Sequence, residues 1–290
     1  MNSTTSDVSA WRTWLAVTTL GIGSFAIVTM ELAPIGLLSN IGQDLGQTEG
    51  RIGLIVTLYA WIAAVAALVS ATTLSHLPRR PLITALMVTL ALSGGTSALA
   101  HTFPILMGSR VVGALAHGAF WAMIGTLGVQ IVPARYIGRA TSIIFGGVSI
   151  ASVLGVPLTN AIGQMDGWRT AFAYIGVLSL LVAGAIALTL PNVPGTQGVD
   201  RAALGRILAN PRFRRLYAAT ACSITAHFMA FTYIEPFLRT MTGGQSGQIA
   251  LLLFAFGGAG LLGNILTGIL IDRFLKPLLV IALVVTSIAL

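Results

Sequence analysis

Charged side chains are scarce in this chain. Asp, Glu, Lys and Arg together supply only 8% of its 290 residues, while hydrophobic residues supply 56%. The mean hydropathy is accordingly high, at +0.90. Water-soluble domains carry about a quarter of charged residues, so this composition excludes a soluble globular protein. It predicts an all-α, polytopic helical membrane protein.

Cysteine is nearly absent as well. The one cysteine, Cys222, can form no internal disulfide, so the sequence implies no oxidising compartment. The sequence also lacks the Gly-x-x-x-x-Gly-Lys stretch of ATP-binding loops and the Gly-x-Ser-x-Gly stretch of hydrolases. No paired spacing of His, Cys, Asp and Glu suggests a metal site. We therefore expect no enzyme, no cofactor and no metal.

Long apolar runs dominate the remainder. A helix needs about 20 residues to cross about 30 Å of hydrocarbon, and eight runs reach that length. The first is too long for the core of a signal peptide, so we expect no cleavage there. A ninth run, 277–290, stops too soon to be a complete span. The eight expected spans are residues 14–38, 52–74, 82–100, 105–129, 140–163, 171–190, 216–238 and 248–271.

Basic residues are distributed unequally between the loops. With a cytoplasmic N-terminus, successive loops alternate between the two sides, and twelve of the sixteen basic residues lie in cytoplasmic segments. Only Arg51, Arg169 and Arg239 then lie outside, and Arg110 alone lies within a span. This is the positive-inside bias, and it predicts that orientation. Topology thus accounts for the net charge of +8, and we expect no nucleic-acid partner.

Two carboxylates interrupt the apolar runs. Glu31 lies inside the first run and Glu235 inside the seventh. Ionisable residues at membrane depth are costly, and they usually line solute or proton pathways. The pair therefore favours a transporter that handles protons. Two structural interpretations stay open: that Glu31 serves the helix break at Pro34, and that Glu235 is a solvated carboxylate beside Arg239 at the i+4 position.

The polar stretch 191–215 divides the chain into two parts. We interpret it as a cytoplasmic linker between an N-terminal six-helix bundle, 1–190, and a partial C-terminal bundle, 216–290. Glu31 and Glu235 are separated by 204 positions, and Pro81 and Pro277 by 196, which indicates an internal repeat. Two halves of about 200 residues imply a complete protein of about 400. We therefore expect this chain to be a truncated form, lacking the end of the ninth span and three further spans.

Several stretches carry a resemblance to a known family: Glu31–Leu38, Ser109–Trp121, Gly167–Phe172 and Thr225–Phe237. In these the chain resembles the drug:proton antiporter branch of the major facilitator superfamily. Within that branch it is most similar to bacterial sugar-efflux transporters, which export arabinose and related sugars. The resemblance implies two six-helix bundles with a solute cavity between them, a place in the bacterial inner membrane, and a monomer.

The chain departs from the family signature after the second span. Ser75, His76 and Pro78 replace its usual Asp, Arg and Gly. Those departures leave a charge-relay gate at this turn in question, although the second half keeps an Asp-Arg pair. Small residues in the fifth span resemble the antiporter motif and are expected to pack helices closely. The expected gating and packing residues are Arg79, Arg80, Gly155, Pro157, Asp272 and Arg273.

The fourth and seventh spans supply further cavity candidates. Arg110, His117 and Trp121 share one helical face. Arg110 either assists proton transfer, as the resemblance implies, or reaches to the membrane interface. His117 either relays protons or packs through hydrogen bonds, and Trp121 either stacks on the solute or belongs to the core. His227 lies about 80° around the helix from Glu235, so either both border one cavity or His227 is a structural histidine.

These observations together predict a secondary efflux transporter that exchanges protons for sugars or related small polar solutes. One alternative is a multidrug exporter of amphipathic compounds on the same fold. Another is an inactive fragment of such a transporter. The expected site consists of Glu31, Arg110, His117, His227 and Glu235, with Tyr59, Trp121 and Asn264 as weaker candidates. The expected partners are the solute, protons and the lipid bilayer.

Overall fold

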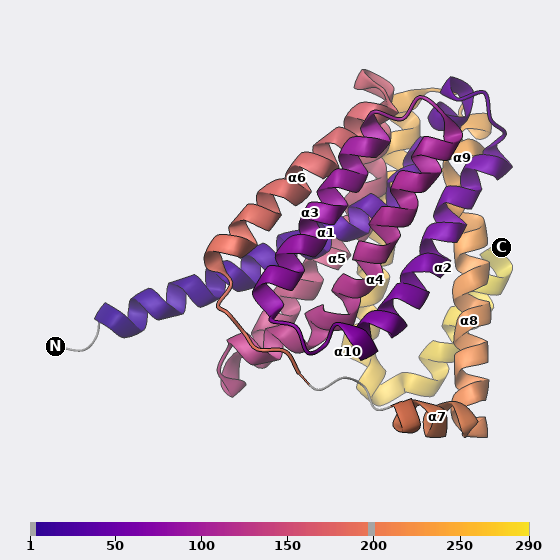
Figure 1. Cartoon of the computed structure of the whole chain (residues 1–290). Coiled ribbons are helices and arrows are strands. Elements are labelled where there is room, and N and C mark those ends of the chain that lie inside the picture. Colours follow the sequence, from indigo (N-terminus) through magenta and orange to yellow (C-terminus); the bar gives the residue numbers. More distant parts are fainter. Residues whose placement is uncertain (1–3, 197–200, 290) are drawn as a thin grey trace.

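The computed structural model describes residues 4–196 and 201–289, and every long element in these ranges is a helix (Figure 1). This confirms the all-α fold. Only the three-residue 3-10 helix η1 (Ala134–Tyr136) interrupts the series of α-helices. They are α1 (Thr4–Asp44), α2 (Glu49–Thr73), α3 (Arg79–Ala98), α4 (Phe103–Ile131), α5 (Ile137–Asp166), α6 (Trp168–Thr189), α7 (Arg201–Ala209), α8 (Pro211–Thr232), α9 (Ile234–Met241) and α10 (Ser246–Ala289).

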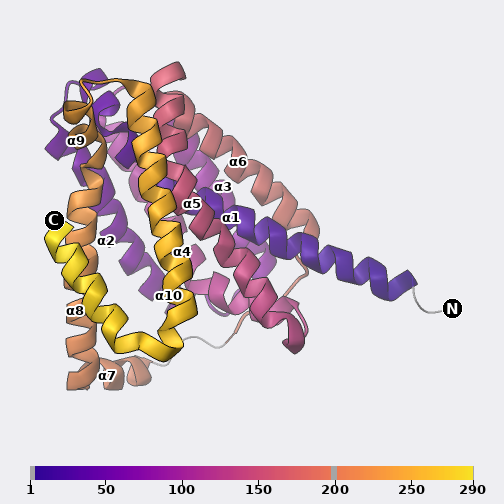
Figure 2. The same ribbon diagram turned by 180° about the vertical axis from the view of Figure 1, so that it is seen from behind.

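The first six α-helices are long and apolar enough to cross a membrane, as expected from the first six runs. Helix α1 packs along α5 and α6, while α2 packs against α4, and α3 lies against α4 and α6 (Figures 1 and 2). Residues of α1 such as Leu20, Ile27 and Leu37 are fully buried, which makes α1 the centre of the bundle. Its N-terminal part extends beyond the other helices.

Glycines let α1 and α5 approach closely. A Cβ atom at Gly147 would overlap the backbone of Gly21, and one at Gly36 would lie 2.6 Å from the Val156 carbonyl oxygen. Lipid offers apolar contacts as good as those between helices, so close packing of small residues supplies much of the attraction between spans. The α1–α5 pair is thus a rigid unit that fixes the position of everything α1 carries.

Prolines account for the irregularities in the second part of the chain. The expected seventh span begins earlier than predicted, at Pro211, and is divided at Tyr233 into α8 and α9. Pro236 has no N–H to donate, and its ring crowds the carbonyl of Thr232, where α8 ends. The expected eighth run and the partial ninth run form one long helix, α10, which kinks at Phe274, three residues before Pro277.

The segment after α6 folds back on the first bundle. The Arg79 amide donates to the Val193 carbonyl over 2.9 Å, and the Thr196 amide donates to the Ser75 carbonyl over 2.8 Å. We call residues 191–196 the strap. The expected linker 191–215 therefore contains the strap, α7 and the first turn of α8, and the division at 190 and 215 stays a prediction.

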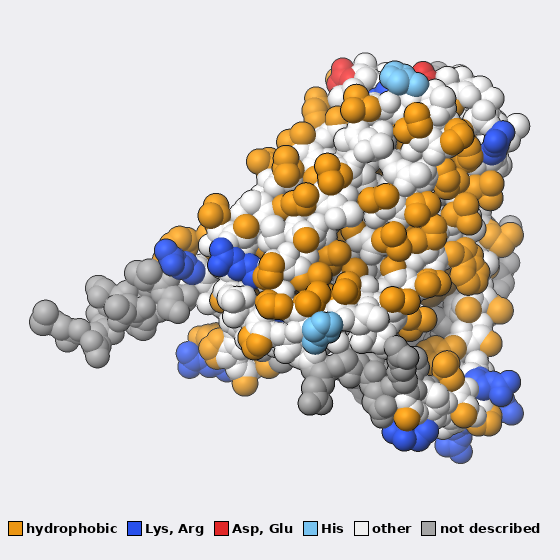
Figure 3. All heavy atoms as spheres, in the orientation of Figure 1, with side chains coloured by type: hydrophobic (Ala, Val, Ile, Leu, Met, Phe, Trp, Pro, Cys, Tyr) orange, Lys and Arg blue, Asp and Glu red, His pale blue; other side chains and the backbone are white. Residues whose placement is uncertain are grey.

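The bundle has two chemically different ends. At one end, which we call the Asp44 end, α1 finishes and α2 begins; at the other, the Arg79 end, α2 finishes and α3 begins. On the face in Figure 3, the visible acidic side chains lie at the Asp44 end and most Lys and Arg side chains lie toward the Arg79 end. The flanks between them are largely apolar, which suits a membrane environment.

Candidate functional site

The carboxyl group of Glu31 lies at the middle of the bundle, beside a histidine of α4. His117 Nε2 is 3.7 Å from Glu31 Oε2. The Glu31 side chain is 24% exposed, whereas that of His117 is only 6% exposed. Within α1, therefore, Glu31 differs from its buried apolar neighbours, because part of its side chain is accessible to a solute or to water. The structure brings these two predicted residues together.

Arg110 is also part of this cluster, but it does not bind the carboxylate. Its Nη1 donates to the carbonyl oxygen of Met30 over 2.8 Å, and its Nη2 donates to that of Glu31 over 3.3 Å. Pro34 has no N–H, so the Met30 carbonyl, four residues earlier, lacks its helical partner. Arg110 supplies the missing hydrogen bond. The residue is 1% exposed, so the bundle encloses its guanidinium group.

Aromatic rings form a wall around these groups. The Arg110 guanidinium lies over the Tyr59 ring, 4.1 Å from its centroid. Tyr59 meets His117 edge-on at 5.4 Å between centroids, and His117 lies 6.2 Å from Trp121. Trp121 continues the series to Phe145 of α5, at 5.9 Å. Such a wall offers ring faces beside a few fixed polar groups, a common composition of binding sites.

Polar atoms without partners lie in the same region. Tyr59 Oη and Arg110 Nε are buried and have no hydrogen-bond partner among the described residues. Buried polar groups normally find partners, so an unpaired one usually indicates a ligand or a water molecule. These two neighbouring side chains, on α2 and α4, therefore mark a place where an external polar molecule can bind.

The structure places His227 and Glu235 outside this cluster. His227 lies on α8, stacked on Phe231 with a centroid distance of 5.6 Å. Glu235 lies on α9, fully buried, and accepts hydrogen bonds from the Ser39 amide at 3.2 Å and from Arg239 Nε at 2.9 Å. The pairing with Arg239 agrees with the alternative interpretation from the sequence, but the carboxylate is buried and not solvated. Ser39 is eight residues beyond Glu31, so the two carboxylates lie at different depths.

Arg79 and Arg80 contact backbone and hydroxyl groups. Arg79 Nη2 donates to Thr196 Oγ1 of the strap over 2.6 Å, and Arg80 Nη2 donates to the Ala187 carbonyl of α6. Gly155 faces α1, because a Cβ there would lie 3.4 Å from Thr29 Oγ1. Pro157 is inside α5. The remaining candidates are in α10, but their side chains lie outside the described residues: Asn264, Asp272 and Arg273.

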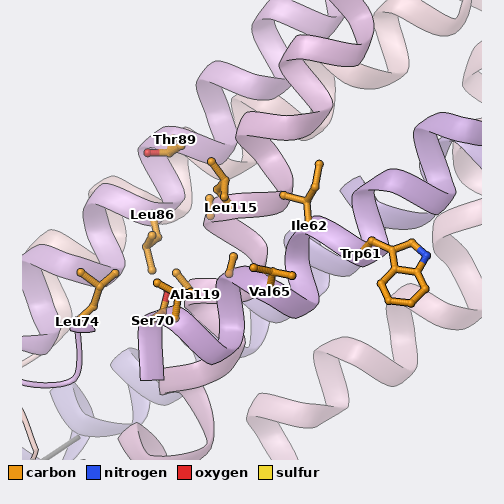
Figure 4. A pocket seen from close by; sticks show the side chains of 12 residues that line it. Trp61, Ile62, Val65, Ser70, Leu74, Leu86, Thr89, Leu115 and Ala119 are labelled. Carbon is orange, nitrogen blue, oxygen red and sulfur yellow. The ribbon is translucent and has the colours of Figure 1, made fainter. Parts of the chain in front are cut away.

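Sequence reasoning missed two features of this region. Phe145 and Phe172 complete the aromatic surroundings, and Phe172 lies 5.8 Å from the Arg110 guanidinium. Phe172 ends the stretch Gly167–Phe172, which carries part of the family resemblance, and this membership is the sequence signal that could have found it. The second feature is an apolar groove of about 530 Å³ between α2, α3 and α4 (Figure 4), which does not include Glu31. Among its lining residues are Trp61, Val65, Leu86, Leu115 and Ala119.

Solved structures share this fold. A bacterial homolog of the human lysosomal transporter Spinster, in an inward-facing and unoccupied conformation, superposes with a TM-score of 0.75 at 17% identity. The match covers 92% of this chain and 64% of that one, so the chain spans less than two thirds of its length. A D-xylose-proton symporter matches with a TM-score of 0.63 at 16% identity, covering 90% of this chain and 69% of the symporter.

A family model provides the independent assignment. The model of the Major Facilitator Superfamily matches residues 17–290, nearly the whole sequence. The matched region includes all of the cluster around Glu31 and both parts of the chain on either side of the strap. The helical architecture and the structural neighbours agree with that match. The chain therefore belongs to the Major Facilitator Superfamily and has the fold of its membrane transporters.

Proposed function

We propose that this protein is a proton-coupled efflux transporter for sugars or related small polar solutes. The observation that carries the proposal is the cluster of Glu31, His117, Tyr59 and Arg110 in the middle of the bundle. Glu31 can hold a proton or, when ionised, accept charge-assisted hydrogen bonds from a solute, so protonation and tight binding of the solute compete. That competition is what an exchange of protons for solute requires.

The chemistry of the cluster favours a polyhydroxyl solute. Tyr59 Oη and Arg110 Nε are unpaired donors, and the Glu31 carboxyl is an acceptor. A sugar presents hydroxyl groups that donate and accept, and its flat C–H face packs against aromatic rings such as Trp121. The resemblance of Thr225–Phe237 to sugar-efflux transporters supports the same class. One structural neighbour is a D-xylose-proton symporter, which is consistent with this choice of solute class.

A multidrug exporter of amphipathic cations is the second candidate. The series Tyr59, Trp121 and Phe145 favours it, because aromatic faces attract organic cations beside a carboxylate. One contact argues against it. The Arg110 guanidinium already occupies the face of Tyr59 and adds a positive charge that repels another cation. We therefore place the sugar first.

The proposed orientation follows from the basic residues. The Arg79 end faces the cytoplasm of a bacterial cell, with the N-terminus on that side, and the Asp44 end faces outward. Protons entering down their gradient would drive the solute outward. We propose that the transporter works as a monomer in the inner membrane.

The test is retention of labelled arabinose in cells that express the protein, with and without a proton uncoupler. We expect Glu31→Gln to abolish export down to the uncoupled level, because the amide cannot take up and release a proton. Asp166→Asn is the matched control, since Asp166 is exposed at the Asp44 end and should leave export unchanged. Efflux by Glu31→Gln at the original rate, in cells with normal amounts of protein, would reject the proposal. Export of a labelled lipophilic cation in place of arabinose would favour the second candidate.

A further inference from the structure

Glu235 is a carboxylate with no exposed surface, in a helix of only eight residues. A buried charge is tolerated when it is paired and its lone pairs are hydrogen-bonded, because desolvation is otherwise too costly. Glu235 meets both conditions. Arg239, one turn later on α9, donates from Nε at 2.9 Å, and the backbone amide of Ser39 on α1 donates at 3.2 Å.

Arg239 makes a second contact with the first bundle. Its Nη2 donates to Asn40 Oδ1 over 2.8 Å. Asn40 is itself held from two sides: its Nδ2 donates to the Gly163 carbonyl, and its Oδ1 accepts from Gln164 Nε2. A polar unit thus joins α9 to the ends of α1 and α5. We call Ser39, Asn40, Glu235 and Arg239 the clasp.

A neighbouring contact brings α2 into the same junction. A Cβ atom at Gly53 would overlap the Tyr233 hydroxyl group, which lies against α2 at the break between α8 and α9. From the clasp toward the Arg79 end, the helix before α9 is much less buried. Among the described side chains of α8, only Thr232 at its last position is buried. Helix α9 lies against α1 at the Asp44 end, and α8 runs away from it toward the opposite end (Figures 1 and 2).

The clasp and Glu31 share one helix. Ser39 follows Glu31 by eight residues, which is about 12 Å along the α1 axis. Any path from the Asp44 end to the Glu31 carboxyl between the two parts of the chain must pass the level where α1 and α9 are joined. The clasp therefore lies between the proposed site and that side of the membrane.

We propose that the clasp is the gate of the Asp44 end, closed in this structure, and that it opens to release solute on that side. This deepens the proposed function and rests on it. Its chemistry suits reversible opening. While α1 and α9 are together, the charges satisfy each other; when they separate, water can hydrate both ions. A junction of apolar side chains would be penalised on exposure to water. A contact with two discrete arrangements is what alternating access requires.

The test measures access to position 31 from outside the cell. In a Cys222→Ser background, which removes the native cysteine, Glu31→Cys provides a reporter for a membrane-impermeant methanethiosulfonate reagent. Labelling should be slow while the clasp is intact. We expect Arg239→Gln or Asn40→Ala to raise the labelling rate about tenfold, which corresponds to a shift of about 1.4 kcal/mol in the opening equilibrium.

Two controls separate a gate from a general loss of packing. Arg169→Gln breaks an ion pair at the same end, Arg169 Nη1 with Asp44 Oδ2 at 2.8 Å, which lies wholly within the first bundle. It should leave the labelling rate unchanged. The exchange Glu235→Arg with Arg239→Glu keeps an i,i+4 pair on α9 but loses acceptance from the Ser39 amide. It should label as fast as Arg239→Gln.

Labelling does not depend on transport, so its outcome is separate from the arabinose test. An unchanged labelling rate in folded Arg239→Gln and Asn40→Ala would overturn the gate. Equal acceleration by Arg169→Gln would also overturn it, because the effect would then reflect loosening of the whole end. Protein in the membrane at normal abundance, with a single cooperative melting transition in detergent, establishes that each variant is folded.

Discussion

Arg110, on α4, donates its hydrogen bonds to the backbone of another helix, α1. Pro34 leaves the Met30 carbonyl without its helical donor, and the Arg110 guanidinium takes that place at 2.8 Å. The second contact, with the carbonyl of Glu31 itself, fixes the segment from which the carboxyl projects. Arg110 is thus a positioning residue for Glu31, since it holds the backbone and leaves the carboxyl free for His117 or for a solute.

The stability lost when Arg110 is replaced should therefore depend on whether residue 34 is proline. We expect Arg110→Met to lower the free energy of unfolding in detergent by about 1–3 kcal/mol, because a buried carbonyl loses a charged donor. Pro34→Ala restores an N–H that can bond to the Met30 carbonyl within α1. In the double variant the loss caused by Arg110→Met should shrink by about 1 kcal/mol. SDS titration of all four proteins measures this cycle, and strictly additive effects would contradict the assigned role.

The sequence sufficed to predict the members of the Glu31 cluster but not how they are connected. Glu31 and Arg110 were conspicuous as charges inside apolar runs, and His117 follows Arg110 on the same helical face. The pairing of Arg110 with a backbone carbonyl depends on which face of α4 meets α1, which periodicity alone does not determine. For Glu235, its distance along the chain from Ser39 hid the contact that buries it.

At the scale of elements, backbone contact between helices decides the packing. Gly146 and Gly147 are neighbours in α5, yet only Gly147 faces α1, where a Cβ would overlap the Gly21 backbone. A Cβ at Gly146 meets nothing within 4 Å. Adjacent residues point in different directions around a helix, so the two positions are a matched pair for testing the α1–α5 contact.

We expect Gly147→Ala to lower the melting temperature in detergent and the amount of protein in the membrane, because α1 must move away from α5. Gly146→Ala should leave both unchanged or raise them slightly, since alanine favours the helix over glycine. Fluorescence-detected size-exclusion after heating gives the comparison. Equal melting temperatures for the two variants would mean that α1 and α5 are not in such close contact.

Helix boundaries show where the sequence was less informative. The first six runs became α1 to α6, because each has about twenty apolar residues between polar turns. The seventh run appeared continuous by hydropathy, yet Pro236 ends α8 at Thr232 and starts a short helix that carries the clasp. The merging of the last two runs into α10 was not foreseen, since Pro277 kinks the helix and does not end it.

At the scale of the whole molecule, the first bundle meets the helices beyond the strap at the clasp, at the neighbouring contact of Tyr233 with Gly53, and between α5 and α10. In the α5–α10 contact, a Cβ at Gly257 would lie 2.7 Å from the Val153 carbonyl oxygen. Pro157 lies four residues after Val153, so this carbonyl lacks its usual helical donor and is free to accept a close neighbour.

Gly257→Ala should separate α5 from α10 and slow the proposed export of labelled arabinose at least about threefold, because the proposed transport cycle needs the two parts of the chain to stay in contact while they move. Gly258→Ala is the matched control, as a Cβ there meets nothing within 4 Å. It should export at the original rate. If the two variants export equally, the α5–α10 contact does not influence the transport cycle.

The strap changes how the two parts of the chain are tethered. The covalent connection to the helices beyond the strap begins at the end of α6, but the hydrogen bonds of the strap to Ser75 and Arg79 fasten it to the turn between α2 and α3. The free part of this connection therefore starts at that turn and not at the end of α6. Residues added after Thr196 would lengthen the free part, whereas residues added between Thr189 and Val193 would leave its length unchanged.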